Sequence, residues 1–155
     1  MRSTYTRSTP QESVATRKLV WVGPLTIVLA VLANLVVRAL AVSFFGVSSS
    51  FPYLQAPVII ITTIVFLVLA LLAFVLVDRV SSHPVRSFRI LGGIALVVSF
   101  VNPLLQLAGH WLPAVGMNLR IFWTMIVMHI ASALIAASLL TTLAVERVRP
   151  LGHEL

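Results

Sequence analysis

Residues 58–77 read VIIITTIVFLVLALLAFVLV and contain no charged side chain. A helix of about 20 apolar residues spans the hydrocarbon core of a bilayer, which is roughly 30 Å thick. Stretches of this character predict helices at about 19–45, 55–77, 88–108 and 119–144. The composition agrees, because 59% of the residues are hydrophobic and 10% are charged, far from the balance of a soluble domain. The sequence therefore predicts an all-α, polytopic membrane protein built as a four-transmembrane-helix bundle.

The basic residues separate the two sides of this bundle. All Lys and Arg residues except Arg38 and Arg120 lie in the segments 1–18, 78–89 and 147–149. The two other connections contain no Lys, Arg, Asp or Glu; they are 43–54 and 109–118. Short cytoplasmic connections carry an excess of Lys and Arg. We therefore expect a multi-pass protein of the plasma (inner) membrane with its N-terminus and its C-terminus in the cytoplasm.

The chain divides into one membrane domain and two tails. The predicted four-helix domain covers residues 19–145. The N-terminal tail, 1–18, is rich in Ser, Thr and Arg and is expected to be disordered, while 146–155 forms a second cytoplasmic tail. Within the third helix, Asn102-Pro103 predicts a kink or an early stop, because proline has no amide hydrogen for the helical ladder.

Charge and cysteine content exclude several classes of partner and chemistry. The formal net charge is +7, but the basic residues border the apolar runs, where they would meet lipid headgroups. We therefore expect the lipid bilayer as partner and no nucleic acid. The chain has no cysteine, so it holds neither a disulfide nor a thiolate metal site.

The polar residues inside the predicted helices lie at the membrane midplane or farther outward. With a rise of about 1.5 Å per residue, Arg38 lies roughly 28 Å beyond the start of the first helix. Arg38 also lacks a carboxylate at its depth, because the acidic residues belong to the cytoplasmic side; they are Glu12, Asp78, Glu146 and Glu154. Its guanidinium must find neutral acceptors, freed backbone carbonyls, lipid phosphate or a bound anion.

An ionisable residue within the membrane generally faces the bundle interior or a wet cavity. We therefore expect an outward-opening polar pocket that offers a positive site to a small anion or a lipid headgroup. Its predicted ligand-binding residues are Arg38, Asn34, Asn102, His129, Thr62, Thr63, Ser99 and Gln106. The alternative is that Arg38 snorkels outward and Asn34 makes an interhelical hydrogen bond. Arg120 is interpreted as an interfacial anchor.

His129 lacks the partners of most histidine sites. A haem commonly needs two axial ligands at matching depth, but His83, His110 and His153 all lie outside the predicted spans. Buried carboxylates for a metal site or a proton relay are also missing. Two alternatives stay open: a hydrogen-bonded histidine between helices, or a titratable member of the polar pocket. We expect no metal, no cofactor and no enzyme activity, since no nucleophile and base pair is visible.

Small residues at four-residue spacing in the fourth predicted helix allow another helix to approach closely. The pairs are Ser132 with Ala136 and Ala133 with Ala137. They predict packing within the chain or, alternatively, contact with a second copy or another membrane protein.

Several short motifs carry a resemblance to a known family. They are Ala33-Asn34-Leu35-Val36-Val37-Arg38, Pro57 with Thr62-Thr63, Ser99 followed by Asn102-Pro103, and Met128-His129. With these motifs, residues 20–145 resemble an uncharacterised family of small four-helix bacterial integral membrane proteins, mostly actinobacterial, classed as a domain of unknown function. The resemblance implies a bacterial plasma-membrane setting and the same four-helix fold, but no activity.

Two functions are therefore open. The first is binding or passage of a small anion or lipid headgroup at the polar pocket. The alternative is an accessory or structural membrane subunit that acts through helix packing with a partner.

Overall fold

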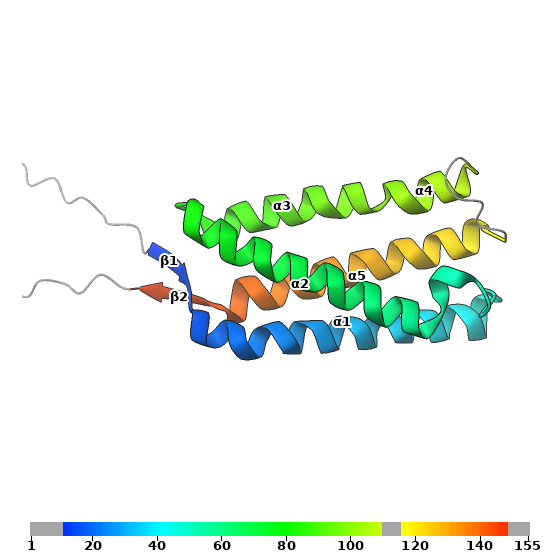
Figure 1. The fold of residues 1–155 in the computed structure, drawn as a ribbon, viewed down its shortest axis with the longest axis horizontal. Helices are drawn as coiled ribbons and strands as arrows, with labels where there is room; N and C mark the ends of the chain where they lie inside the picture. The colour runs from blue at the N-terminus through cyan, green and yellow to red at the C-terminus, as the bar shows by residue number, and fades with distance from the viewer. Residues whose placement is uncertain (1–10, 110–115, 149–155) are drawn as a thin grey trace, which may run out of the picture.

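A computed structural model describes residues 11–109 and 116–148, which form a bundle of long helices with a short β-ribbon at one end (Figure 1). The elements are β1 (Gln11–Val14), α1 (Thr16–Phe45), the 3-10 helix η1 (Pro52–Leu54), α2 (Ala56–Val80), α3 (Pro84–Ser99), α4 (Val101–Leu107), α5 (Leu119–Leu143) and β2 (Val145–Val148). Four helical segments in the described ranges are long and apolar enough to cross a membrane: Arg17–Phe45, Ala56–Val80, Pro84–Leu107 and Leu119–Leu143. They confirm the predicted helical fold and indicate a multi-pass membrane protein.

Local sequence signals set the ends of these helices. Gly46 follows α1 with a φ of 62°, a left-handed conformation that glycine adopts without steric cost. Pro57 and Pro84 lie in the first turn of α2 and α3, where a missing amide hydrogen matters least. Asn118 caps α5, because its Oδ1 accepts hydrogen bonds from the amides of Arg120 and Ile121 at 3.0 and 3.1 Å.

The third of these long apolar segments is broken in two, as Asn102-Pro103 predicts. Helix α3 ends at Ser99, and α4 begins at Val101. Since Pro103 has no amide hydrogen, the carbonyl of Ser99 loses the donor that a continuous helix would supply four residues later. The predicted single helix 88–108 is therefore two helices, and it starts four residues earlier than expected.

The β-ribbon joins the segment before α1 to the segment after α5 at one end of the bundle. Strand β1 pairs antiparallel with β2, so that Val14 faces Val145 and Gln11 faces Val148. The pairing continues up to the helix ends, because the amide of Ala15, which precedes α1, donates to the carbonyl of Ala144, which follows α5, at 2.9 Å. The ribbon corrects the predicted tails: residues 11–14 and 146–148 are paired strand, and α1 begins at Thr16. The rest of both tails lies outside the described residues.

Helices α1 and α5 form the most extensive helix contact; α2 packs on α1, and α3 with α4 packs on α5. We call the end with the ribbon the terminal end, and the end with residues 46–55 and the start of α5 the loop end. A cluster around Phe74, Phe88 and Leu140 fills the terminal end. The cluster at the loop end contains Ala41, Val47, Phe51, Leu54, Ile59, Ile121, Met125 and Met128.

Large apolar side chains cover the outside of the bundle. Val36 on α1, Phe66 on α2 and Val97 on α3 are all more than half exposed. Isolated apolar side chains on a surface are common in soluble proteins, but here they continue along the whole length of spanning helices. This surface indicates contact with lipid.

Candidate functional site

Asn34 connects three helices in the middle of the bundle. Its side chain on α1 is 4% exposed, and its Nδ2 donates to the hydroxyl oxygens of Thr63 on α2 and Ser132 on α5, at 3.0 and 2.9 Å. Both amide hydrogens are therefore used, whereas the Oδ1 atom is buried and has no hydrogen-bond partner among the described residues. The structure thus unites two predicted pocket residues with one predicted packing residue.

Arg38 lies one helical turn closer to the loop end and binds a backbone group. Its Nε donates to the carbonyl of Leu54 at 2.5 Å, and the Leu54 side chain is buried at the end of η1. Within the ranges 11–109 and 116–148, no carboxylate pairs with this guanidinium. Arg38 therefore holds the 46–55 connection against α1 through a neutral acceptor that the sequence does not single out.

Thr62 and Ser99 do not join a shared site. The hydroxyl of Thr62 donates to the carbonyl of Val58 at 2.7 Å, on the exposed side of α2. The hydroxyl of Ser99 donates to the carbonyl of Leu96 at 2.6 Å. Each hydroxyl thus donates its hydrogen bond to a carbonyl of its own helix, as Ser and Thr commonly do inside helices.

Asn102 and Gln106 form a pair within α4. The Nε2 of Gln106 donates to the Oδ1 of Asn102 at 3.1 Å. Gln106 is 4% exposed, and its Oε1 is a second buried acceptor without a partner in the described part of the chain. Asn102 itself is exposed.

His129 lies beside the break between α3 and α4. Its Nδ1 is 2.6 Å from the carbonyl oxygen of Met125, and because a carbonyl only accepts, this nitrogen carries the proton. In the neutral ring the lone pair then belongs to Nε2. The imidazole meets the ring of Phe100 edge-on, with 6.3 Å between centroids. His129 is half-buried, and this hydrogen bond lies within α5, so both alternatives for its role stay predictions.

The predicted packing residues of α5 face two directions. Ser132 contacts Asn34, and Ala136 is buried against Ala30 on α1 and Leu67 on α2. Ala133 and Ala137 are half-buried. The Ser132 and Ala136 pair therefore packs inside the chain.

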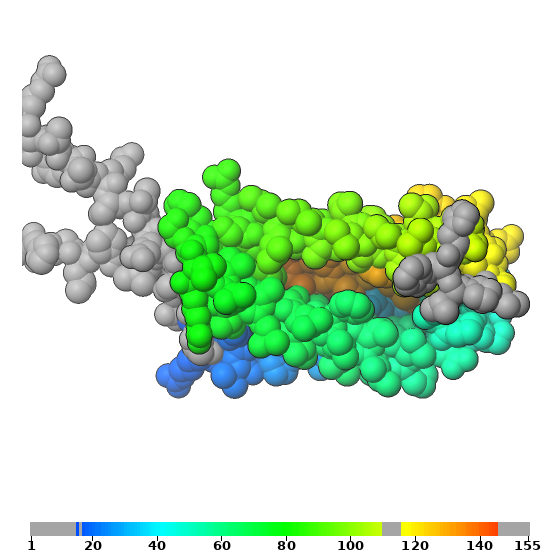
Figure 2. Space-filling model, turned by 45° about the horizontal axis from the view of Figure 1, so that its top comes forward, coloured from blue at the N-terminus to red at the C-terminus, as the bar shows by residue number. Residues whose placement is uncertain are grey.

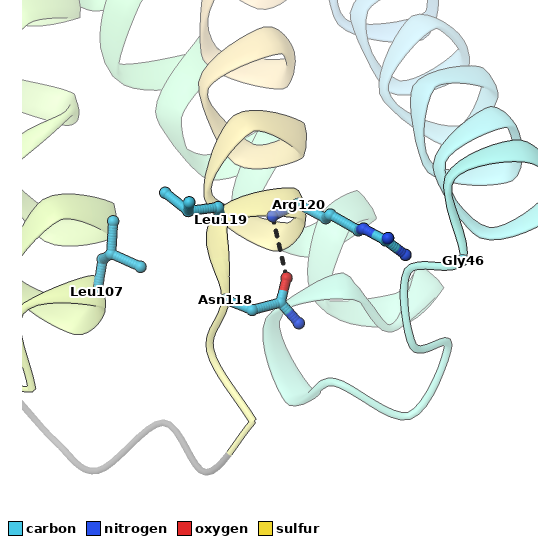
Figure 3. Close-up of a pocket in the computed structure, with 5 residues that line it drawn as sticks. All are labelled: Gly46, Leu107, Asn118, Leu119 and Arg120. Atoms are coloured by element: carbon cyan, nitrogen blue, oxygen red, sulfur yellow. Dashed lines mark hydrogen bonds between the residues drawn. The ribbon is translucent and has the colours of Figure 1, made fainter.

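A cavity of about 530 Å³ lies at the loop end, outside the predicted set of residues. Gly46, Leu107, Asn118, Leu119 and Arg120 line it, and Figure 3 shows the first turn of α5 between the ends of α4 and α1. The Nη1 of Arg120 donates to the carbonyl of Phe45 at 3.1 Å. A Cβ atom on Gly46 would lie 3.2 Å from this nitrogen, so glycine permits the close approach.

The sequence predicts that Arg120 is an interfacial anchor and does not predict a cavity beside it. Two signals were available: Asn118 directly precedes an apolar run, as an N-cap does, and Arg120 follows it without a nearby acidic residue. Gly46 and the two leucines carry no such signal.

The described part of the chain offers no cluster of metal ligands. No three His, Asp or Glu residues among those described lie close enough to share a metal ion. His110 and His153 fall outside the described residues.

Comparison with known proteins places the whole folded unit in one family. A model of a family of unknown function, DUF6069, matches residues 14–148. The chain belongs to this family. The matched DUF6069 region runs from Val14, the last residue of β1, to Val148, the end of β2, so it contains all four helical segments that are long and apolar enough to cross a membrane.

This DUF6069 protein matches no curated protein and no solved structure. Family membership confirms the resemblance to an uncharacterised domain of unknown function and gives no activity, while the bacterial and actinobacterial setting stays a prediction.

Proposed function

We propose that this protein binds an anionic group, the phosphate of a lipid headgroup or a small anion, at its loop end, and that the loop end faces the outside of the plasma membrane. In this orientation both termini are cytoplasmic, which agrees with the concentration of Lys and Arg near the terminal end. The proposed activity is binding, without a catalytic step or a cofactor.

The observation that carries the proposal is the placement of Arg120 at the 530 Å³ cavity, in a half of the protein without carboxylates. No Asp or Glu occurs between residues 13 and 77 or between 79 and 145. Neither Arg120 nor Arg38 can therefore be neutralised by an acidic residue of the loop end, and both donate to backbone carbonyls.

The chemistry of the cavity fits an anion. A guanidinium presents five N–H donors in a planar fork that matches phosphate oxygens, and the hydrogen bond to Phe45 uses one of them. Asn118 adds a side-chain amide to the same lining. Hydrogen bonds to charged groups each contribute about 1.5–3 kcal/mol, so a single phosphate contact with Arg120 is enough for measurable selectivity.

The remaining predicted pocket residues support this proposal only in part. Arg38 lies at the same end of the bundle, whereas the amide nitrogen of Asn34 and the hydroxyls of Thr62 and Ser99 donate hydrogen bonds within the protein. A role as an accessory subunit through Ser132 and Ala136 is less favoured, because these residues pack inside the chain. Oligomeric state stays a prediction.

Native mass spectrometry of the purified protein in detergent tests the proposal. The probes are phosphatidylglycerol and a diacylglycerol with the same chains but no phosphate. We expect the wild type to prefer phosphatidylglycerol, and we expect Arg120→Gln to weaken its binding about tenfold, the loss of one charge-assisted hydrogen bond.

Arg79→Gln is the matched control, because it removes the same charge from an exposed position at the terminal end. It should bind phosphatidylglycerol like the wild type. Equal binding of the two lipids, or equal loss in the two variants, would overturn the proposal. Inorganic phosphate, added as a competitor, separates a free anion from a lipid headgroup: only a site for the free anion is displaced at millimolar concentration.

A further inference from the structure

The hairpin of α2 and α3 is closed at the terminal end and open toward the loop end. The rings of Phe74 and Phe88 meet at a centroid distance of 4.7 Å, and both are buried. Beyond this contact the two helices diverge, and α4 packs on α5 without a comparable contact to α2 (Figure 1). Figure 2 shows the result as a hollow between α2 and the α3–α4 segment, with α5 at its bottom.

Gly92 marks the point where the hollow begins on α3. It lies one turn beyond Phe88, on the same face of the helix, and it is half-buried. Nevertheless, a Cβ atom at Gly92 would meet nothing within 4 Å. The face of α3 that packs at Phe88 therefore borders open space one turn later.

The bottom of the hollow is formed by the side of α5 that lies between α2 and the α3–α4 segment. On this helix Ala136 lies in one buried cluster with Leu67 of α2 and Ala30 of α1, whereas His129 contacts Phe100 at the α3–α4 break. We call the hollow between Gly92 and Phe100, with this part of α5 as its floor, the lateral groove.

We infer that the lateral groove binds a hydrocarbon chain of a phospholipid from the leaflet at the loop end. The inference deepens the proposed function, on which it rests for the headgroup. It makes the ligand an amphiphile, with its phosphate at the loop end near Arg120 and one chain between α2 and the α3–α4 segment.

The shape of the groove selects a lipid chain over a partner helix. A spanning helix needs the full thickness of about 30 Å, but the Phe74–Phe88 contact closes the groove toward the terminal end. A lipid chain needs only its own leaflet, about half of that thickness. From Gly92 to Phe100 the groove extends about 12 Å along the helix axis, which is most of the length of such a chain.

Two adjacent glycines of α3 provide the test. Gly92→Leu fills the groove, whereas Gly93→Leu adds the same side chain to an exposed position, also with nothing within 4 Å. In native mass spectrometry with phosphatidylglycerol, we expect Gly92→Leu to weaken binding about tenfold, as the loss of a few buried methylene groups would. Gly93→Leu should bind like the wild type.

A fluorescence measurement in vesicles covers the case in which Gly92→Leu fails to fold. Leu96→Trp, on the half-buried face of α3, and Ile94→Trp, on its exposed face, are compared after Trp21, Trp111 and Trp123 are each replaced by Phe. Phosphatidylglycerol with brominated chains should quench the Leu96→Trp variant at a lower mole fraction than the Ile94→Trp variant, because a bound chain occupies the groove before the bulk lipid is exchanged.

The outcomes separate this inference from the proposed function. In one outcome, Arg120→Gln binds phosphatidylglycerol more weakly, Gly92→Leu binds it like the wild type, and the two tryptophan variants are quenched equally. This outcome overturns lipid binding in the groove and supports the anion site. Binding of phosphatidylglycerol that falls in Gly92→Leu and is unchanged in Arg120→Gln supports the groove and overturns the anion site. A second copy of the chain, bound in place of lipid and lost in Gly92→Leu, would also overturn the inference.

Discussion

The side-chain nitrogen of Asn34 lies 2.9 Å from the hydroxyl oxygen of Ser132, a residue 98 positions further along the chain. The same nitrogen reaches Thr63 on α2, so one buried amide joins three helices that the sequence separates widely. In a membrane, helix association depends on packing and interhelical hydrogen bonds more than on the hydrophobic effect. Asn34 therefore fixes how α1, α2 and α5 are rotated relative to one another.

Replacing Thr63 by valine should destabilise this junction. The change keeps the shape of the side chain but leaves one buried N–H of Asn34 without an acceptor, which costs about 1–2 kcal/mol. The measurement is the free energy of unfolding of the detergent-solubilised protein. Thr62→Val is the matched control, because that hydroxyl bonds to its own helix on an exposed face, and its unfolding free energy should change by less than about 0.5 kcal/mol. Equal changes in the free energy of unfolding for the two variants would contradict a stabilising hydrogen bond between Asn34 and Thr63.

Gly46→Ala should be destabilising at the loop end. Residue 46 has a φ of 62°, and this left-handed backbone alone costs about 1–2 kcal/mol for a residue other than glycine. In addition, the new Cβ atom would lie 3.2 Å from the Nη1 of Arg120. The readout is the melting temperature of the purified protein.

Gly93→Ala is the control, because it should change the melting temperature in the opposite direction. This glycine lies inside α3 with open space around it, and alanine is the better helix former by about 1 kcal/mol. The melting temperature should rise in Gly93→Ala and fall in Gly46→Ala. A rise in both variants would mean that the 46–55 connection does not hold the described conformation.

Arg38→Gln should loosen the connection between α1 and α2. The guanidinium no longer holds the carbonyl of Leu54, so the amides of Leu54 and Gln55 should exchange hydrogen faster; both bond only within the turn that begins at Phe51. Hydrogen exchange with mass spectrometry measures this. An increase of about tenfold corresponds to the loss of one charge-assisted hydrogen bond, whereas Arg79→Gln should leave the segment unchanged. Unchanged exchange in Arg38→Gln would show that the Leu54 contact contributes nothing to the order of this segment.

The sequence predicts where the long apolar helices lie but not which contacts their polar residues make, and the reason is geometric. Apolar runs such as 58–77 require a helix wherever they enter lipid, because every backbone group must be satisfied within the segment. Depth along a helix also follows from residue number. The angle around the helix axis does not, because it depends on which neighbour packs where.

Thr62 and Thr63 illustrate this difference. The two residues have the same type and nearly the same depth, yet Thr63 meets Asn34 and Thr62 faces outward. The partner of Arg38, a backbone carbonyl at the end of η1, depends on a loop conformation that no hydrophobic pattern encodes. The ribbon is a similar case, because its two strands have four residues each and pair across almost the whole chain.

The register of the ribbon can be tested by introducing pairs of cysteines, because the chain has no cysteine of its own. Ser13 faces Glu146, and facing residues in an antiparallel pair lie about 4.5–5.5 Å apart between Cα atoms, within the range that a disulfide spans. Ser13→Cys with Glu146→Cys should therefore form an intramolecular disulfide when isolated membranes are oxidised, seen as a mobility shift on a non-reducing gel. Gln11→Cys with Val145→Cys is the control; Gln11 faces Val148, which displaces the pair by three residues, or roughly 10 Å, beyond disulfide reach. Crosslinking of both pairs, or crosslinks between chains alone, would refute the register and with it the attachment of α1 to α5 at the terminal end.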